Sequence, residues 1–273
     1  METGLKGKVV IVTGGASTIG RATVLAFAKE GSKIIIADID EPQGQKTASK
    51  AKELGAETVM VIKTDVTHVD EVDNMVKTVI KEFGAIDVLV NNVGRPYDKD
   101  LVSEETKELI AEEMGVNLMG TINCTKAILP HMIQAGKGNI VNIGSEAGRA
   151  GDPARVIYST SKGAVISFTK AVAQGVGRQG IRVNCICPNT IMPTSREEVG
   201  DGSAFHPRTG IFNVASRTDP KYMGKREKAL ERLAISRMGK PADVAPAVVF
   251  LASEGASYIT GQTLSINGGI SMI

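Results

Sequence analysis

The chain has 273 residues, of which 42% are hydrophobic and 23% charged, and its formal net charge is +2. This composition is typical of a folded globular protein, and one α/β domain commonly reaches this length, so we expect a single domain over residues 1–273. Charges of both signs are spread along the chain, which excludes the basic surface of a dedicated nucleic-acid binder. We therefore expect a small-molecule ligand and no nucleic-acid partner.

The apolar runs are far shorter than the ~20 residues that a membrane-spanning helix needs, so we expect no membrane association. The first residues lead directly into a strand-like segment without the pattern of an export signal, which favours a cytoplasmic location. Cys124, Cys185 and Cys187 lie in apolar segments, and we expect reduced, buried thiols. The three histidines show no metal-ligand spacing, so we expect no metal.

Short β-branched segments alternate with longer segments of helical period along the chain. Continuously apolar strands separated by helices are typical of a parallel sheet that is covered on both faces. We therefore predict a doubly wound, seven-stranded α/β fold of the Rossmann type, with a ligand crevice beyond the carboxyl ends of its strands. The predicted strands are 8–13, 33–37, 58–62, 86–90, 139–143, 181–186 and 263–266.

The first predicted strand ends in a glycine-bearing turn that leads into a helix from about residue 19 to residue 30. The N-terminus of such a helix presents backbone N–H groups and a positive dipole end, which suit a pyrophosphate. Glycines also mark ordinary strand–helix turns, so the turn alone does not establish a cofactor site. The residues expected to contact the cofactor here are Gly14, Ser17, Thr18, Ile19 and Gly20.

The second predicted strand is followed by Asp38, 18 residues after Gly20. A carboxylate at this place accepts hydrogen bonds from both hydroxyls of an adenosine ribose and repels a 2′-phosphate, so we expect NAD (NADH) rather than NADP. The alternative is that Asp38 is only a turn residue or a helix cap before Glu41 and Pro42.

Further motifs follow in order along the chain. They are Asp65-Val66, Asn91-Asn92-Val93-Gly94, Asn117, Ser145 and Tyr158-Ser159-Thr160-Ser161-Lys162. With the glycine turn, they make nearly the whole chain resemble the short-chain dehydrogenase/reductase family. Its alicyclic alcohol and cyclic hydroxyacyl-CoA dehydrogenases look most similar.

The resemblance implies a role for each of these motifs and also a homotetramer. Asp65 and Val66 would border the adenine ring, and Asn91 and Val93 would border the cofactor. The implied catalytic group is Asn117, Ser145, Tyr158 and Lys162, and the implied further cofactor contacts are Tyr158, Lys162, Pro188, Ile191 and Thr194.

Tyr158 and Lys162 are four residues apart on a predicted helix and therefore share one face. A phenol with a pKa of about 10 is a poor base at neutral pH, and we expect the neighbouring ammonium to lower that pKa into a useful range. Ser145 would hydrogen-bond the substrate oxygen. By resemblance, Asn117 anchors, at a helix distortion, a water that links Lys162 to solvent. Each assignment has a structural alternative. Tyr158 and Lys162 can be a surface pair, Ser145 an ordinary turn residue and Asn117 a polar residue in a core helix.

Several residues depart from the family pattern. Thr18 stands where a glycine is usual in the cofactor turn, and Val93 stands where an alanine is common. Asn189 follows Pro188 in place of a usual glycine, and Thr194 is displaced by one position from the expected nicotinamide contact.

The segment of about 189–235 is expected, by resemblance, to cover the substrate. Residues 205–232 hold seven basic and three acidic side chains, which would suit an anionic substrate or the phosphates of a coenzyme A ester. A solvated helix face explains the same charges. We thus expect an NAD-dependent secondary-alcohol dehydrogenase that acts on an alicyclic or hydroxyacyl-CoA substrate. The alternatives are a 3-oxoacyl-thioester reductase and a non-catalytic structural subunit of the same fold.

Overall fold

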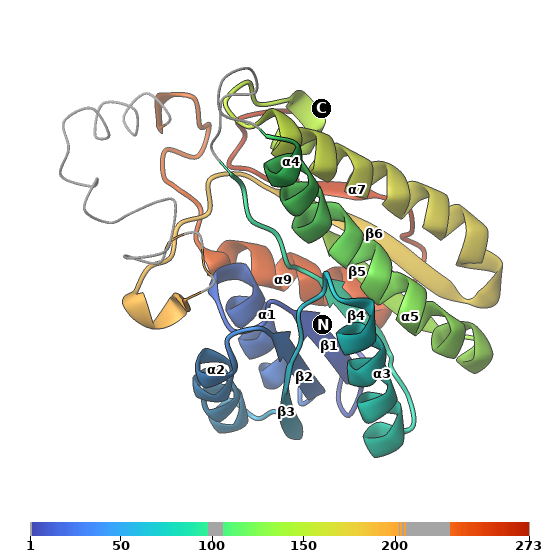
Figure 1. The fold of residues 1–273 in the computed structure, drawn as a ribbon. Coiled ribbons are helices and arrows are strands. Elements are labelled where there is room, and N and C mark those ends of the chain that lie inside the picture. The colour runs from blue at the N-terminus through green and yellow to red at the C-terminus, as the bar shows by residue number, and fades with distance from the viewer. Residues whose placement is uncertain (1, 98–105, 202, 204, 206–229, 273) are drawn as a thin grey trace.

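A parallel sheet in the order β3-β2-β1-β4-β5-β6-β7 forms the core of the protein (Figure 1). The structure is a computed structural model that describes residues 2–97, 106–201, 203, 205 and 230–272. The predicted doubly wound, seven-stranded sheet is confirmed, and each predicted strand ends within two residues of the observed one. The strands are β1 Val9–Thr13, β2 Lys33–Asp38, β3 Thr58–Lys63, β4 Val88–Asn91, β5 Gly138–Ile143, β6 Ile181–Pro188 and β7 Thr263–Ile266.

Helices cover both faces of the sheet, which explains why the strands are apolar throughout. Along β1, Val10 and Val12 pack into the core under α1, α2 and α9, while Val9 and Ile11 pack into the opposite core under α3, α5 and α7 (Figure 1). The helices are α1 Thr18–Lys29, α2 Glu41–Glu53, α3 Val69–Phe83, α4 Lys107–Met114, α5 Gly120–Ala135, α6 Ala147–Ala150, α7 Val156–Val176 and α9 Pro241–Ala252.

The strand order places the crevice of the sheet. β1 pairs with β2 on one side and with β4 on the other, so the chain winds away from β1 in both directions. The connections diverge at this point and leave a crevice at the carboxyl ends of the strands. The expected location of the ligand crevice is thus present in the fold.

Further findings concern the cysteines, metal-binding groups and membrane-spanning helices. Cys124, Cys185 and Cys187 are free and buried, as predicted. Within the described ranges, no three or more His, Cys, Asp or Glu side chains are grouped so that they could hold a metal ion. Nor does any helix of those ranges have the length and apolar character needed to cross a membrane.

Candidate active site

A cavity of about 1000 Å³ lies at the carboxyl ends of the strands. Its walls include segments that follow all seven strands, so residues far apart in the sequence meet there. Most of the predicted site residues line this cavity: Gly14, Ser17, Thr18, Ile19, Asp38, Asp65, Val66, Val93, Ser145, Tyr158, Lys162, Pro188 and Ile191. The predicted residues that do not line it are Gly20, Asn91, Asn117 and Thr194.

The glycine turn after β1 brings the start of α1 close to the strand. Gly14 has a φ of +62°, and a Cβ on Gly20 would lie 2.0 Å from the Gly14 carbonyl oxygen. The first turn of α1 contains no acidic residue, and the side chain of its N-cap, Ser17, does not cap it. The free N–H groups and the dipole end are thus available to an anion such as a pyrophosphate.

Thr18 explains why a glycine is usual at its position. Its φ is +45°, in the left-handed region that side chains with a branched Cβ rarely adopt. The turn keeps this backbone conformation although the residue is not glycine. Thr190, near the end of β6, has a similar φ of +46°.

Ser17 also holds a segment from the far end of the chain. Its Oγ accepts a hydrogen bond from the Gly200 N–H at 2.8 Å. Asp40 Oδ2 accepts one from the Asp201 N–H at 2.8 Å, and Gln43 Nε2 donates to the Glu197 carbonyl at 2.7 Å. We call residues 196–201 the strap. Most of the basic residues predicted to cover the substrate, between 206 and 229, fall outside the described residues.

Asp38 is fixed against the glycine turn at the end of β2. Its Oδ2 accepts a hydrogen bond from the Ala16 N–H at 2.9 Å, and its Oδ1 accepts one from the Asp40 N–H at 3.0 Å. Burial raises the pKa of Asp38, and the backbone hydrogen bonds from Asp40 and Ala16 oppose that shift. The carboxyl group therefore has a fixed orientation beside the N-terminus of α1.

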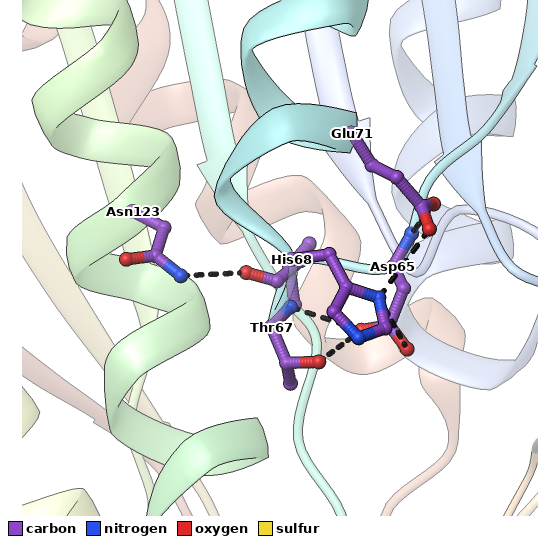
Figure 2. Close-up of polar contacts among 6 residues, drawn as sticks. Asp65, Thr67, His68, Glu71 and Asn123 are labelled. Atoms are coloured by element: carbon purple, nitrogen blue, oxygen red, sulfur yellow. Dashed lines mark hydrogen bonds and ion pairs between the residues drawn. The ribbon is translucent and has the colours of Figure 1, made fainter.

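The loop after β3 forms another wall of the cavity, and Figure 2 shows its polar contacts. Asp65 Oδ1 accepts hydrogen bonds from the Thr67 N–H at 2.9 Å and the Thr67 hydroxyl at 2.7 Å, while Glu71 accepts the Asp65 N–H at 2.8 Å. Asn123 on α5 donates to the Val66 carbonyl at 3.0 Å. These bonds fix the loop, so Asp65 and Val66 have defined positions at the cavity.

The end of β4 and the loop after it form hydrogen bonds both to the glycine turn and to the centre of the sheet. Asn91 is buried behind the cavity, where its Nδ2 donates to Thr125 Oγ1 and Asn142 Oδ1. Asn92 lines the cavity and donates to the carbonyls of Thr13 and Gly14 at 3.0 and 3.1 Å. Asn92 belongs to the motif Asn91-Asn92-Val93-Gly94, for which the resemblance implies that Asn91 and the following loop border the cofactor, without a separate role for Asn92.

Ser145, Tyr158 and Lys162 meet at the cavity, the first after β5 and the other two on α7. Lys162 Nζ lies 5.9 Å from the centre of the Tyr158 ring and donates to the Ile143 carbonyl at 2.9 Å. Burial lowers the pKa of Lys162 to about 8. The predicted grouping of these three side chains is present.

The expected net lowering of the Tyr158 pKa is absent in this arrangement. Burial raises the pKa of the phenol above its usual value, because the anionic form loses its hydration. The groups that oppose this shift are the Ser145 hydroxyl, through a hydrogen bond, and the Arg155 guanidinium, through its charge. Arg155 was missed because it lies in a turn before the helix, where sequence spacing gives no signal.

Asn117 lies at a helix distortion, as the resemblance implied. The α-helical pattern is replaced by a π-helix over Gly115–Met119, between α4 and α5. Asn117 Oδ1 accepts the Arg95 N–H, and its Nδ2 donates to the carbonyls of Arg95 and Glu113. A Cβ on Gly94 would lie 3.1 Å from Asn117 Oδ1 and 2.7 Å from Lys162 Nζ, so both side chains close around Gly94.

Thr194 does not reach the cavity. Its hydroxyl donates to Glu198 Oε1 at 2.7 Å, and its side chain is exposed. Pro188 and Ile191 do line the cavity, as predicted. Thr194, which is displaced by one position from the expected nicotinamide contact, therefore lies against the strap and not at the cavity.

Comparison with known proteins gives the site its context. The family model described as short chain dehydrogenase matches residues 8–203. A 3-oxoacyl-[acyl-carrier-protein] reductase of Thermotoga maritima is 36% identical over 97% of this chain and 98% of its own length. The L-fucose dehydrogenase of Bos taurus is 38% identical over 98% of this chain and 91% of its own.

A third relative acts on a coenzyme A ester by its name. It is the (2S)-[(R)-hydroxy(phenyl)methyl]succinyl-CoA dehydrogenase subunit of Thauera aromatica, 33% identical over 98% of both chains. The family match extends from β1 to the strap and includes every motif of the cavity described above. The chain belongs to the short-chain dehydrogenase/reductase family of nicotinamide-dependent oxidoreductases.

Proposed function

We propose that the protein is an NAD-dependent enzyme that interconverts a secondary alcohol and a ketone, with an alicyclic or hydroxyacyl-CoA compound as substrate. The observation that carries the proposal is that Ser145, Tyr158 and Lys162 share one cavity with the glycine turn. An acid–base group and an anion-binding helix terminus are the two parts that hydride transfer between an alcohol and a dinucleotide requires.

The residues present fit a dinucleotide. Gly20 lets α1 begin directly against the turn, because a Cβ there would overlap the Gly14 carbonyl oxygen, and the free N–H groups at the N-terminus of α1 suit a pyrophosphate. Asp38 would hold the ribose hydroxyls, Asp65 and Val66 would border the adenine ring, and Pro188 and Ile191 would contact the nicotinamide. The bound cofactor would supply the hydride acceptor in alcohol oxidation.

The chain's own residues handle the proton. The Ser145 hydroxyl donates a hydrogen bond to the substrate oxygen and holds it near Tyr158. In oxidation the Tyr158 phenolate oxygen accepts the hydroxyl proton, and in reduction the phenol returns it. The Lys162 ammonium, whose pKa is about 8, lies 5.9 Å from the centre of the Tyr158 ring, and Asn117 fixes the loop that surrounds it.

Asp38 supports NAD over NADP. Its carboxyl group is held at the turn by two backbone N–H groups, where it would lie against a 2′-phosphate. The relative from Thermotoga maritima favours a second candidate, reduction of a 3-oxoacyl thioester. A preference for NADPH would favour that second function.

The test follows the absorbance of reduced nicotinamide with NAD and NADP over a panel of secondary alcohols and hydroxyacyl-CoA esters. Tyr158→Phe should lose nearly all turnover and still bind NADH, measured by fluorescence titration. Tyr97→Phe is the matched control, because Tyr97 also lines the cavity but its hydroxyl donates to Glu112 at 2.6 Å. Near-normal turnover of Tyr158→Phe would contradict the mechanism.

The same assay also tests two further possibilities, a non-catalytic subunit and a cover that binds phosphates. A non-catalytic structural subunit would bind no NADH and turn over no substrate, whereas the intact Ser145–Tyr158–Lys162 group supports catalysis. Equal kcat/KM for a hydroxyacyl-CoA ester and its free alcohol would argue against a phosphate-binding cover. The homotetramer and the cytoplasmic location stay predictions, which size-exclusion chromatography and cell fractionation test.

A further inference from the structure

Beside the proposed catalytic serine, the carboxyl group of Glu146 is deeply buried and only partly used. Glu146 is 4% exposed and lines the cavity. Its Oε1 accepts a short hydrogen bond from the Ser265 hydroxyl, but its Oε2, also buried, has no hydrogen-bond partner among the described residues. A buried carboxylate oxygen without a partner costs free energy, so its place at the cavity wall needs a reason.

Two further polar atoms are buried without a hydrogen-bond partner among the described residues. They are Asn189 Nδ2 and Ser271 Oγ. Both residues line the same cavity. The cavity thus holds an unused acceptor on Glu146, an unused amide donor on Asn189 and an unused hydroxyl on Ser271, which can act in either way.

Backbone hydrogen bonds bring these residues together at the ends of β5, β6 and β7. The Glu146 N–H donates to the Pro188 carbonyl at 3.1 Å, directly before Asn189, whose own N–H donates to the Ile266 carbonyl at 3.2 Å. Asn267, the next residue after Ile266, donates through Nδ2 to the Ser271 carbonyl at 2.7 Å. One continuous set of bonds therefore links all three segments.

The surroundings fix Glu146 in place. Arg149 Nη1 donates to Ser265 Oγ at 2.6 Å, and Ser265 donates in turn to Glu146 Oε1. This chain of bonds from α6 to β7 holds the carboxyl group in one orientation. A side chain held in this way is preorganised to accept a hydrogen bond with little loss of conformational freedom.

We propose that Glu146, Asn189 and Ser271 form a polar subsite that binds a second hydroxyl group of the substrate, so that the preferred substrate is a cyclic diol or polyol. The inference rests on the proposed function and names its substrate class. A hydroxyl donates to Glu146 Oε2 and accepts from Asn189 Nδ2, which satisfies both atoms at once. The Glu146 charge disfavours a carboxylate or phosphate at this place. Ser145 and Glu146 are adjacent in the chain and both line the cavity, so the second hydroxyl would lie close to the reacting oxygen.

The test compares cyclohexanol with the vicinal cyclohexanediols at saturating NAD. The wild-type enzyme should favour a diol by about tenfold or more in kcat/KM, because the analogue without the second hydroxyl leaves buried polar atoms unpaired. Glu146→Gln retains an acceptor for Ser265 and should lose most of this preference, while cyclohexanol turnover and NADH affinity stay near the wild-type values. Ser271→Ala removes a hydroxyl that has no partner within the described residues and should weaken the preference without a loss of folding.

Glu112→Gln is the matched control, because Glu112 also lines the cavity but lies on α4 and accepts from Tyr97. It should leave the diol preference unchanged. Equal kcat/KM for diol and monol in the wild type, or an equal loss for both substrates in Glu146→Gln, would overturn the subsite and leave the dehydrogenase intact. A weaker NADH affinity in Glu146→Gln with the diol preference retained would assign these atoms to the nicotinamide. If NADH binds but no alcohol reacts, the proposed function fails as well.

Discussion

The left-handed backbone conformation of Thr18 introduces conformational strain into the glycine turn after β1. With a φ of +45°, the Cβ of an L-residue crowds the backbone carbonyl and costs about 1–2 kcal/mol relative to a right-handed conformation. A glycine at this position avoids this cost, but its greater conformational freedom in the unfolded chain lowers the free energy of unfolding by about 0.4–1 kcal/mol. Thr18→Gly should therefore raise the free energy of unfolding by about 0.5–1 kcal/mol.

Urea unfolding followed by circular dichroism measures this change, and a rise in Tm of about 1–3 °C should accompany it. The matched control is Thr78→Gly on α3, where the Thr78 hydroxyl donates to the Asn74 carbonyl at 2.8 Å. A glycine in this helical position should lower stability by about 0.5–1 kcal/mol. The two substitutions remove the same side chain, so their opposite signs would reflect the different backbone conformations together with the hydrogen bond that Thr78→Gly loses.

A loss of stability in Thr18→Gly similar to that in Thr78→Gly would refute the argument from strain. The NADH affinity of Thr18→Gly serves as a second readout in a fluorescence titration. Binding should persist, because the proposed pyrophosphate contacts are backbone N–H groups of α1 rather than the Thr18 side chain.

Three further outcomes are expected. Asp38→Asn should raise kcat/KM with NADP relative to NAD by about tenfold, because a repelling charge is lost; an unchanged ratio in steady-state assays would exclude Asp38 as the selector. Arg155→Gln removes a charge that lowers the pKa of Tyr158, so the pH profile of alcohol oxidation, which needs the phenolate, should move to higher pH; a shift to lower pH would contradict this. Gly20→Ala places a Cβ 2.0 Å from the Gly14 carbonyl oxygen and should destabilise the protein by about 1–3 kcal/mol in urea titrations, whereas Gly175→Ala, with open space around it, should not.

The sheet was predictable because its signal is local. A strand such as Lys33–Asp38 is apolar on both faces, and this pattern together with the intervening helices determines a covered parallel sheet. The crevice followed from the chain order of the strands. The charge-rich segment between 206 and 229 gave a hypothesis about the substrate that the described residues do not address.

The site was predictable where residue spacing determines contact. Tyr158 and Lys162 share a helix face, and Gly14 and Asp38 follow neighbouring strands. The direction of the Tyr158 pKa was not predictable, since it depends on burial and on Arg155, which only the folded chain brings together. Glu146, Asn189 and Ser271 escaped sequence reasoning for the same reason, because each looks like an ordinary loop residue until its surroundings are known.

The strap links the start of α1 to a distant part of the chain. Its hydrogen bonds join it to Ser17, at the N-terminus of α1 that suits the diphosphate, and to Asp40 and Gln43, at the start of α2. If the proposed function holds, a dinucleotide at the N-terminus of α1 would depart more readily once these three bonds have broken. The maximal turnover rate of such an enzyme would depend on how often a surface segment detaches, as well as on the rate of its chemical step.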